Sequence, residues 1–257
     1  MRIADTAALV TGAASGLGGA TARALAAKGA TVFGLDLPQA IDGIAASGQD
    51  AVDGITYVAA DVTNPEQVGA AVEQASSGDK PLRITVNCAG IGTAGRVLSK
   101  KGPHDLDLYR KIIEVNLIGT FNVLRLAADA ITKTEPLTDD ARGVIVNTAS
   151  IAAFDGQVGQ VAYSSSKGGV VGLTLPAARD LAQFGVRVMT IAPGIVDTPM
   201  LAGVSDEFRA TLSSGVPFPK RLATPEEYAQ LVVDIAEHDY LNGEVIRMDG
   251  ALRMAPR

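Results

Sequence analysis

A tyrosine and a lysine four residues apart stand out among the side chains that could do chemistry. Tyr163 and Lys167 lie in the stretch YSSSKGG, with only serines between them. Four residues make about one helical turn, so on a helix the two side chains would share a face. The pair alone is weak evidence, because a free tyrosine is a poor base with a pKa of about 10. A catalytic interpretation needs a cofactor and further polar groups nearby.

A glycine-rich stretch near the start of the chain is the best candidate for the cofactor site. In TGAASGLG (11–18), Gly12, Gly16 and Gly18 would let the backbone turn tightly and approach a pyrophosphate. A helix expected after them would offer N–H groups and the positive end of its dipole. The spacing G-x-x-x-G-x-G differs from the usual dinucleotide fingerprint, so a plain strand–helix turn remains the alternative.

An acidic residue indicates which dinucleotide would bind. Asp36 ends the second apolar run, 18 residues after Gly18. An acid there can bond the adenosine ribose hydroxyls and would repel the 2′-phosphate of NADP. Ser15, not a basic residue, precedes Gly16, and no Lys or Arg follows Asp36 in DLP. The sequence therefore predicts NAD; the alternative for Asp36 is a turn residue before Pro38.

Composition excludes several other classes. The chain has 257 residues, 47% apolar and 19% charged, with a net charge of −6. It has no Lys/Arg-rich block, so we expect neither nucleic acid nor a membrane surface as a partner. With two histidines and one cysteine no zinc constellation forms, and no metal is predicted. G-x-S-x-G and P-loop motifs are absent from the sequence.

The lone cysteine and the N-terminus bear on the compartment. Cys88 cannot form an internal disulfide, which favours a reducing compartment. MRIADTAALVTG reaches an apolar run without a signal peptide, and no run is long enough to span a bilayer. We therefore expect a cytoplasmic protein.

Strand-like and helix-like stretches alternate along the whole chain. Strands are predicted at 7–10, 31–36, 55–61, 82–90, 143–150, 186–194 and 244–250. Helices are predicted at 16–29, after Pro38, and at 64–76, 106–132, 161–185 and 224–238. Most strands read as continuous Val/Ile runs, typical of strands buried on both faces. This predicts an α/β fold: a single-domain, doubly wound, seven-stranded parallel sheet of Rossmann type over 1–257, with helices on both faces.

Pro176 lies inside one predicted helix. Its ring would crowd the carbonyl of Gly172, whose lack of a side chain helps the chain accommodate it. We expect a continuous helix from near Ala162 to Phe184 that bends beside Pro176.

With TGAASGLG, NCAG (87–90), VN (115–116), NTAS (147–150) and YSSSK in order, the chain resembles the short-chain dehydrogenase/reductase family. The resemblance implies nicotinamide-dependent oxidoreduction by the tetrad Asn116, Ser150, Tyr163 and Lys167. Tyr163 would accept the alcohol proton, Ser150 would bond the substrate oxygen, and Asn116 would hold a water linked to Lys167. A lysine charge about 4 Å away is large enough to lower the tyrosine pKa by about 3 units.

The same resemblance implies the other site residues. Cofactor contacts fall on Gly12, Ser15, Gly16, Leu17, Gly18, Asp36, Asp61, Val62, Cys88, Ala89, Gly90, Tyr163, Lys167, Pro193, Val196 and Thr198. Substrate contacts fall on Ser150, Gln157, Gln160 and Tyr163. Cys88 departs from the asparagine that the family usually has there.

Within the family, NCAGI, NLIGTFNVLRL, VPFPKRL and NGEVIRMDGALRM are similar to the type II 3-hydroxyacyl-CoA dehydrogenases, also called the type ten 17β-hydroxysteroid dehydrogenase group. That similarity implies a homotetramer and a small-molecule substrate, either a 3-hydroxyacyl-CoA or a steroid-like alcohol. The alternatives are a hydroxysteroid dehydrogenase, a 3-oxoacyl-carrier-protein reductase that would use NADPH, and a non-catalytic NAD-loaded scaffold. Asp197 stands where the group more often has a small residue.

Two loops bear on the substrate. Lys100 and Lys101, in the polar loop 91–105, would contact a CoA phosphate or stay solvated. The loop region of about 194–222 is rich in apolar residues that would cover an acyl or sterol body, or only pack the loop down. The helices at 106–132 and 161–185 are apolar on more than one face, which favours an oligomer.

Overall fold

Seven parallel strands form the central sheet of the computed structural model, which describes residues 1–46, 53–201 and 205–256. Their order across the sheet is β3-β2-β1-β4-β7-β8-β9. The strands are β1 (Ala7–Thr11), β2 (Thr31–Asp36), β3 (Ile55–Ala59), β4 (Leu82–Asn87), β7 (Gly143–Thr148), β8 (Val186–Pro193) and β9 (Val245–Met248). Each neighbouring pair is parallel. The predicted doubly wound α/β fold is therefore confirmed, and all seven carboxyl ends lie along one edge.

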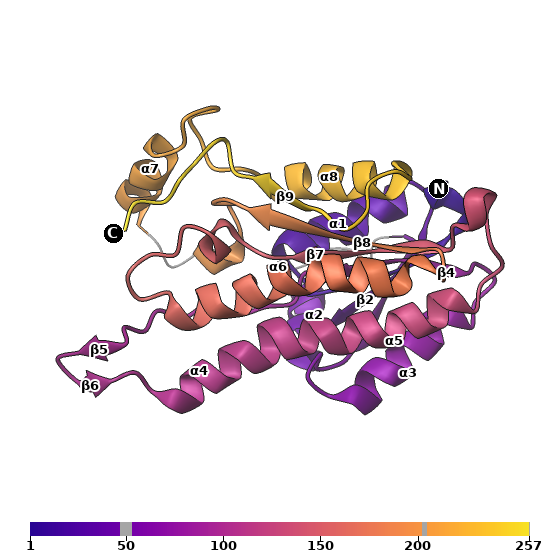
Figure 1. Ribbon diagram of the computed structural model, residues 1–257, viewed down its shortest axis with the longest axis horizontal. Helices are drawn as coiled ribbons and strands as arrows, with labels where there is room; N and C mark the ends of the chain where they lie inside the picture. Colours follow the sequence, from indigo (N-terminus) through magenta and orange to yellow (C-terminus); the bar gives the residue numbers. More distant parts are fainter. Residues whose placement is uncertain (47–52, 202–204, 257) are drawn as a thin grey trace.

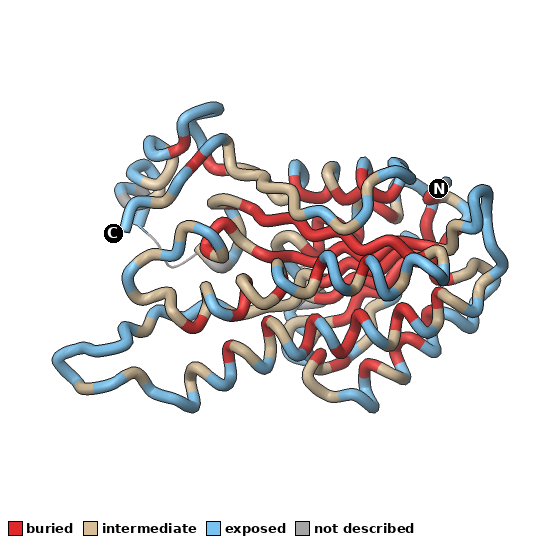
Figure 2. Tube along the Cα trace, in the orientation of Figure 1, coloured by how far each residue is buried: buried red, intermediate tan, exposed pale blue. Residues whose placement is uncertain are grey.

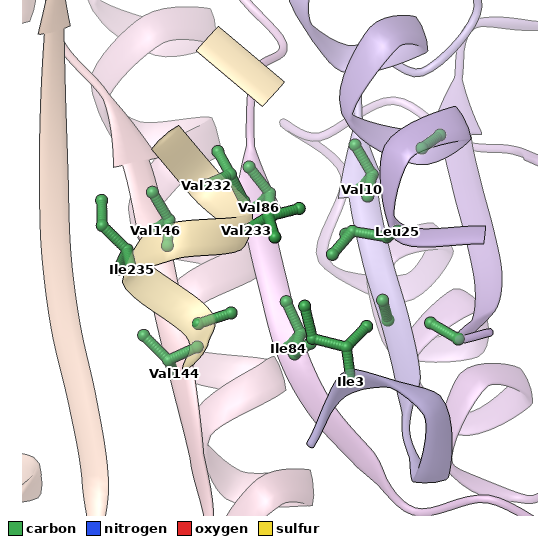
Figure 3. Packing of buried hydrophobic residues seen from close by; sticks show 14 of the residues in the cluster. Ile3, Val10, Leu25, Ile84, Val86, Val144, Val146, Val232, Val233 and Ile235 are labelled. Carbon is green, nitrogen blue, oxygen red and sulfur yellow. The ribbon is translucent and has the colours of Figure 1, made fainter. Parts of the chain in front are cut away.

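Helices cover both faces of this sheet. They are α1 (Gly16–Ala27), α2 (Pro38–Ala46), α3 (Pro65–Ser76), α4 (Leu106–Ile113), α5 (Thr120–Thr132), α6 (Val161–Ala182), α7 (Asp206–Ser214) and α8 (Pro225–Glu237). Figure 1 shows helices on opposite sides of this sheet, α8 on one and α5 on the other. On one face, Leu25 of α1 and Val232 of α8 pack against strand residues such as Val86 (Figure 3). Residues of α3, α5 and α6 pack on the other face. Strands β1, β4, β7 and β8 are buried throughout (Figure 2), which explains their continuous apolar runs.

The local signals for helix ends act as expected. Asn64 caps α3 by accepting the N–H of Gln67 at 2.9 Å. At the start of α8, Thr224 and Glu227 form a capping box, with Pro225 in the first helical position. The α6 helix continues through Pro176 without a break, as predicted, but ends at Ala182 rather than Phe184. The bend beside Pro176 stays a prediction.

The buried face of α6 positions the candidate catalytic residues. Ala162, Ser166, Val170, Thr174 and Ala178 are buried at every fourth position, and Lys167 is buried beside them. This stripe faces the sheet, since residues four apart lie on one side of a helix. Lys167 is thereby directed towards the carboxyl ends of the strands.

Three regions differ from the sequence-based expectation. The helical stretch 106–132 is interrupted by a π-helical segment, Glu114–Gly119. The loop 91–105 contains a short antiparallel hairpin of β5 (Leu98–Ser99) and β6 (Gly102–Pro103). The expected substrate loop contains α7, and its residues 202–204 lie outside the described part of the chain. Two-residue strands and a single π turn leave no periodic pattern for sequence reasoning to detect.

Among the described residues, no helix combines the length and the apolar character needed to cross a bilayer.

Candidate active site

The loops that follow three strands meet at the carboxyl edge of the sheet. Oγ1 of Thr11, at the end of β1, accepts the backbone N–H groups of Cys88 (3.1 Å) and Ala89 (3.0 Å), which follow β4. A Cβ added to Gly16 would lie 3.6 Å from Thr198, in the loop after β8. This edge is where doubly wound folds bind dinucleotides.

The glycine-rich loop has the backbone geometry that a pyrophosphate requires. Gly12 and Gly16 have positive φ angles of 66° and 52°, which glycine adopts without strain. A Cβ at Gly18 would lie only 2.2 Å from the carbonyl oxygen of Gly12, so no side chain fits there. Ser15 is the N-cap residue of α1, but its side chain caps no N–H group. The start of α1 therefore keeps donors for a phosphate, and the residues fit a dinucleotide.

Asp36 ends β2 beside this loop. Its Oδ2 accepts the N–H of Ala14 at 2.9 Å, and its Oδ1 accepts that of Leu37 at 2.8 Å. The carboxylate thus holds the glycine-rich loop against the end of β2, a role that the sequence did not predict. A carboxylate oxygen can accept more than one hydrogen bond, so the predicted contact with ribose hydroxyls stays compatible with this geometry.

The other predicted cofactor residues lie along the same edge. Asp61 and Val62 follow β3, Leu17 is in the first turn of α1, Gly90 follows β4, and Pro193 ends β8.

Two of the predicted cofactor residues have contacts that fix their surroundings. Val196 forms an isolated bridge with Ala223. The Cys88 thiol contacts the hydroxyls of Thr148 (3.6 Å) and Tyr228 (3.7 Å). Desolvation raises the pKa of Cys88, and these hydrogen bonds offset part of the effect. The thiol is therefore a neutral wall of the site rather than a nucleophile.

Lys167 is the buried cation of the site. Lys167 is only 4% exposed. Its Nζ donates to the backbone carbonyl of Thr148 at 2.8 Å. Desolvation lowers the pKa of Lys167 to about 8. The charge is thereby held at the end of β7.

Tyr163 lies one turn before Lys167 on α6, as predicted. Nζ of Lys167 is 5.8 Å from the centre of the Tyr163 ring. Ser150, which follows β7, is close enough to the phenol to lower the pKa of Tyr163, and its Oγ accepts the N–H of Ala152 at 3.1 Å. The structure thus brings together three of the four residues that the family resemblance implied.

The lowering of the Tyr163 pKa, expected with the oxidised cofactor bound, stays a prediction. Desolvation raises the pKa of Tyr163, and the nearby Ser150 offsets only part of that increase. Sequence reasoning placed the lysine charge about 4 Å from the phenol. Nζ donates to the Thr148 carbonyl and lies 5.8 Å from the centre of the Tyr163 ring.

Asn116 is fully buried in the π-helical segment. Its Oδ1 accepts the N–H of Ile91 at 2.8 Å, and Nδ2 donates to the Ile91 carbonyl at 2.9 Å and to Ser166 Oγ at 3.1 Å. These bonds join the loop after β4 to α6. A Cβ at Gly90 would lie 3.2 Å from Asn116 Oδ1 and 3.6 Å from Lys167 Nζ. The predicted water between Asn116 and Lys167 stays a prediction.

The two glutamines predicted to touch substrate bond to the chain itself. Nε2 of Gln157 donates to the carbonyl of Ala255 at 2.9 Å, and Oε1 of Gln160 accepts the N–H of Gln157 at 3.0 Å. Both therefore shape the segment between Ser150 and Tyr163. A cavity of about 430 Å³ lies beside this segment, lined by residues of 95–98 and 156–164.

Asp197 has a clear structural partner. Its carboxylate forms an ion pair with Arg209 of α7, and Arg209 also donates to the Leu201 carbonyl at 3.2 Å. The acidic residue therefore ties α7 to the loop that follows β8. A small residue at position 197 would leave Arg209 without this pair.

Sequence reasoning missed three residues that support the site. Thr148 supplies the carbonyl for Lys167, and its Oγ1 lies 2.6 Å from the hydroxyl of the buried Tyr228. Ser166 bonds both Asn116 and the Tyr163 carbonyl. Thr148 and Ser166 lie inside the quoted motifs NTAS and YSSSK, but Tyr228 comes from α8, and no local pattern links it to them.

Known proteins that match this chain agree with that geometry. A sequence model described as short chain dehydrogenase matches residues 6–208. The 3-hydroxyacyl-CoA dehydrogenase type-2 of Bos taurus is 53% identical over 97% of this chain and 95% of its own length. The protein of that name from Drosophila melanogaster is 50% identical over 99% and 100%.

A solved structure agrees as well. The crystal structure of 3-hydroxyacyl-CoA dehydrogenase type-2 from Mycobacterium avium superposes with a TM-score of 0.91 and 42% identity, covering 98% of both chains. Because the match extends over the strands, the glycine-rich loop and the Ser150–Tyr163–Lys167 arrangement alike, the chain belongs to the short-chain dehydrogenase family of oxidoreductases.

Proposed function

We propose that this protein oxidises the secondary alcohol of a 3-hydroxyacyl-CoA to the 3-oxoacyl-CoA with NAD. The observation that carries the proposal is the arrangement of Ser150, Tyr163 and Lys167 at the carboxyl edge of the sheet. Identity of about half with the type-2 3-hydroxyacyl-CoA dehydrogenases over nearly the whole chain supports the substrate class.

Each of the three side chains has a distinct role in this proposal. Bound NAD would supply the hydride acceptor. Ser150 donates a hydrogen bond to the substrate oxygen and keeps it beside the phenol of Tyr163. Tyr163 accepts the hydroxyl proton as the carbonyl forms. Lys167 stabilises the phenolate by its charge, although its ammonium nitrogen bonds the Thr148 carbonyl.

The raised pKa of Tyr163 indicates that the lysine alone does not make it an effective base near neutral pH. A second positive charge is needed close to the ring, and the oxidised cofactor carries one. The proton taken up by Tyr163 would leave past Lys167 and the space beside Gly90, where Asn116 Oδ1 also faces. We propose that a water occupies this space, as the family resemblance implies.

NAD is preferred over NADP in this proposal because of Asp36. Its carboxylate is fixed at the end of β2 by two backbone N–H groups, where it would meet the 2′-phosphate of NADP at close range. We expect a preference for NAD of at least about 100-fold, since a like-charge contact costs several kcal/mol at such distances. Asp36→Ala should narrow that preference.

The β5–β6 hairpin and the region 194–222 support an amphipathic substrate. Lys100 and Lys101 are exposed at the tip of the β5–β6 hairpin, where they would reach a CoA phosphate. Phe218 in the region 194–222 is largely exposed and would offer apolar surface to an acyl chain.

We further propose a homotetramer in the cytoplasm. Large apolar side chains are exposed on α5 and α6, among them Phe121 and Leu175. Ile118 of the π-helical segment is exposed as well. Nothing lies within 4 Å of a Cβ placed on Gly168 or Gly172 of α6. A smooth helix face beside exposed apolar residues suits close packing against a second copy. The single cysteine of the chain suits a reducing compartment.

A substrate panel tests this proposal. The purified protein would be mixed with NAD or NADP and with 3-hydroxyacyl-CoAs of several chain lengths, steroid alcohols and a 3-hydroxyacyl-carrier-protein thioester. NADH absorbance should rise fastest with a 3-hydroxyacyl-CoA. A higher kcat/KM for a steroid alcohol or for the carrier-protein thioester, or equal use of both cofactors, would contradict the proposal.

A further inference from the structure

Arg247 of β9 makes an unusual number of contacts for one guanidinium. Its Nε donates to Asp249 Oδ2 at 2.8 Å, and its Nη2 donates to Asp155 Oδ2 and to the Leu252 carbonyl at 3.1 Å. The guanidinium carbon also lies 5.2 Å from the centre of the Phe154 ring. Nε and the Nη pair face different carboxylates, as the fork geometry of arginine permits.

Two of these contacts reach the segment that joins the catalytic residues. Residues 151–162, the connecting segment, run from Ser150 to Tyr163, and Phe154 and Asp155 lie within it. Farther along, Gln157 Nε2 donates to the Ala255 carbonyl at 2.9 Å, and the Val158 N–H donates to the Pro256 carbonyl at 3.0 Å. The connecting segment is therefore attached to residues 249–256, the C-terminal segment, at several points.

The C-terminal segment also contacts the region 194–222. Leu252 is buried in one cluster with Ile151 and with Val216 of the region 194–222. The Phe218 N–H donates to the Gly250 carbonyl at 3.3 Å, and a Cβ on Gly250 would clash with Val216 Cγ1 at 2.6 Å. The C-terminal segment thus packs between the connecting segment and the region 194–222.

We propose that Arg247 is a positioning residue for substrate binding: it fixes the C-terminal segment between the connecting segment and the region 194–222, the two walls of the proposed substrate site, and so sets where Ser150 and Tyr163 lie relative to the substrate. The proposal rests on the proposed function. It concerns binding of the substrate rather than of NAD, because the Arg247 contacts named above all lie outside the glycine-rich loop.

The carboxylates of Asp155 and Asp249 explain why another side chain would not replace Arg247. Asp249 is almost buried, with 6% of its side chain exposed, and Asp155 is mostly buried. Arg247 holds the pKa of Asp155 below its usual range, so the Asp155 carboxylate is ionised. A neutral residue at position 247 would leave this mostly buried carboxylate without its ion-pair partner. A lysine has one nitrogen and cannot pair with both carboxylates in the same geometry.

The test compares Arg247→Met and Arg247→Lys with the control Arg253→Met. Arg253 also donates to Asp249, at 3.0 Å, but its side chain is 62% exposed, and its hydrogen bonds go to Asp249 and Leu252 rather than to the connecting segment. For each variant we would measure KM and kcat with the best substrate of the panel, the Kd for NADH, and amide hydrogen exchange in 150–160 and 214–220.

We expect Arg247→Met to raise KM at least tenfold, with kcat changed less than KM and the Kd for NADH within twofold of wild type. Amide exchange in 150–160 should speed up at least tenfold, with α1 unchanged. Arg247→Lys should give a smaller rise in KM, and Arg253→Met should match wild type. Asp155→Asn, which keeps the shape, serves if Arg247→Met fails to fold, with the same expected direction.

Unchanged KM and unchanged exchange in Arg247→Met would overturn the inference, as would an equal effect of Arg253→Met. Failure of the proposed function can be distinguished from failure of the inference about Arg247. In that case the wild type would be inactive with 3-hydroxyacyl-CoAs, and the exchange measurement would still decide whether Arg247 fixes the two walls.

Discussion

The site needs the buried ammonium of Lys167 for its chemistry, and burying this charge lowers the free energy of unfolding. Its pKa is lowered to about 8 by desolvation, against an ordinary value near 10.5. The unfolded chain therefore binds more protons than the folded one between about pH 8 and pH 10.5. Stability rises with pH across that window and is lower below it, by on the order of 3 kcal/mol.

Lys167→Met should therefore separate stability from activity. We expect the variant to lose turnover and to unfold at a higher urea concentration than wild type at pH 7, because the apolar side chain needs no hydration. The difference should shrink as the pH is raised from 8 to 10.5. The exposed Lys133→Met serves as the control and should follow wild type. Urea midpoints for Lys167→Met that track wild type at every pH would contradict the assignment of this cost to Lys167.

At the scale of elements, the capping box of α8 is a local signal with a measurable effect. Thr224 accepts the Glu227 N–H, and Glu227 accepts the Thr224 N–H at 2.9 Å. Arg221 also pairs with Glu227 and lowers its pKa to about 2. Since the folded pKa is depressed, this contribution is present above about pH 4.5 and is lost as the pH falls towards 2.

Thr224→Ala should lower the free energy of unfolding by about 1 kcal/mol, because the first turn of α8 loses its side-chain cap. Thr132→Ala is the matched control: its hydroxyl bonds the Asp129 carbonyl within the last turn of α5, so little should change. Urea denaturation of both variants at pH 7 checks this. Equal losses for the two would show that the capping interaction contributes nothing specific.

The sequence predicted the elements that depend on local patterns but not the contacts between distant segments. The seven strands and the caps at Asn64 and Thr224 are local patterns, and the tetrad residues were found through motifs of neighbouring residues. The π-helical segment depends on Asn116 bonding the Ile91 backbone, and the Arg247 contacts join β9 to a segment 92 residues earlier. Such pairings are set by tertiary packing, so no window of sequence contains them.

For the molecule as a whole, assembly depends on the outer helix surface. We propose that residues 1–257 form one domain, since β1 and β9 belong to the same sheet, and that four copies associate. Phe121 on α5 is 52% exposed, and Leu175 on α6 is 44% exposed. These side chains would be covered in the tetramer.

Phe121→Lys should dissociate the tetramer into smaller species, because a charge would be buried at the contact without a partner. Phe184→Lys is the matched control, since Phe184 is 43% exposed but follows the end of α6. Light scattering at micromolar concentration would separate the outcomes. A monomeric wild type, or a tetrameric Phe121→Lys protein, would contradict the proposed assembly.

The central claim, that Tyr163 accepts the proton in NAD-dependent alcohol oxidation, has one direct measurement. Tyr163→Phe keeps the ring and removes the hydroxyl that would accept the proton. NADH formation from a 3-hydroxyacyl-CoA would be followed for wild type and variant, alongside fluorescence titration of NADH binding. We predict that the variant binds NADH as wild type does and shows no detectable turnover. Turnover within tenfold of wild type would contradict the assignment of Tyr163 as the base.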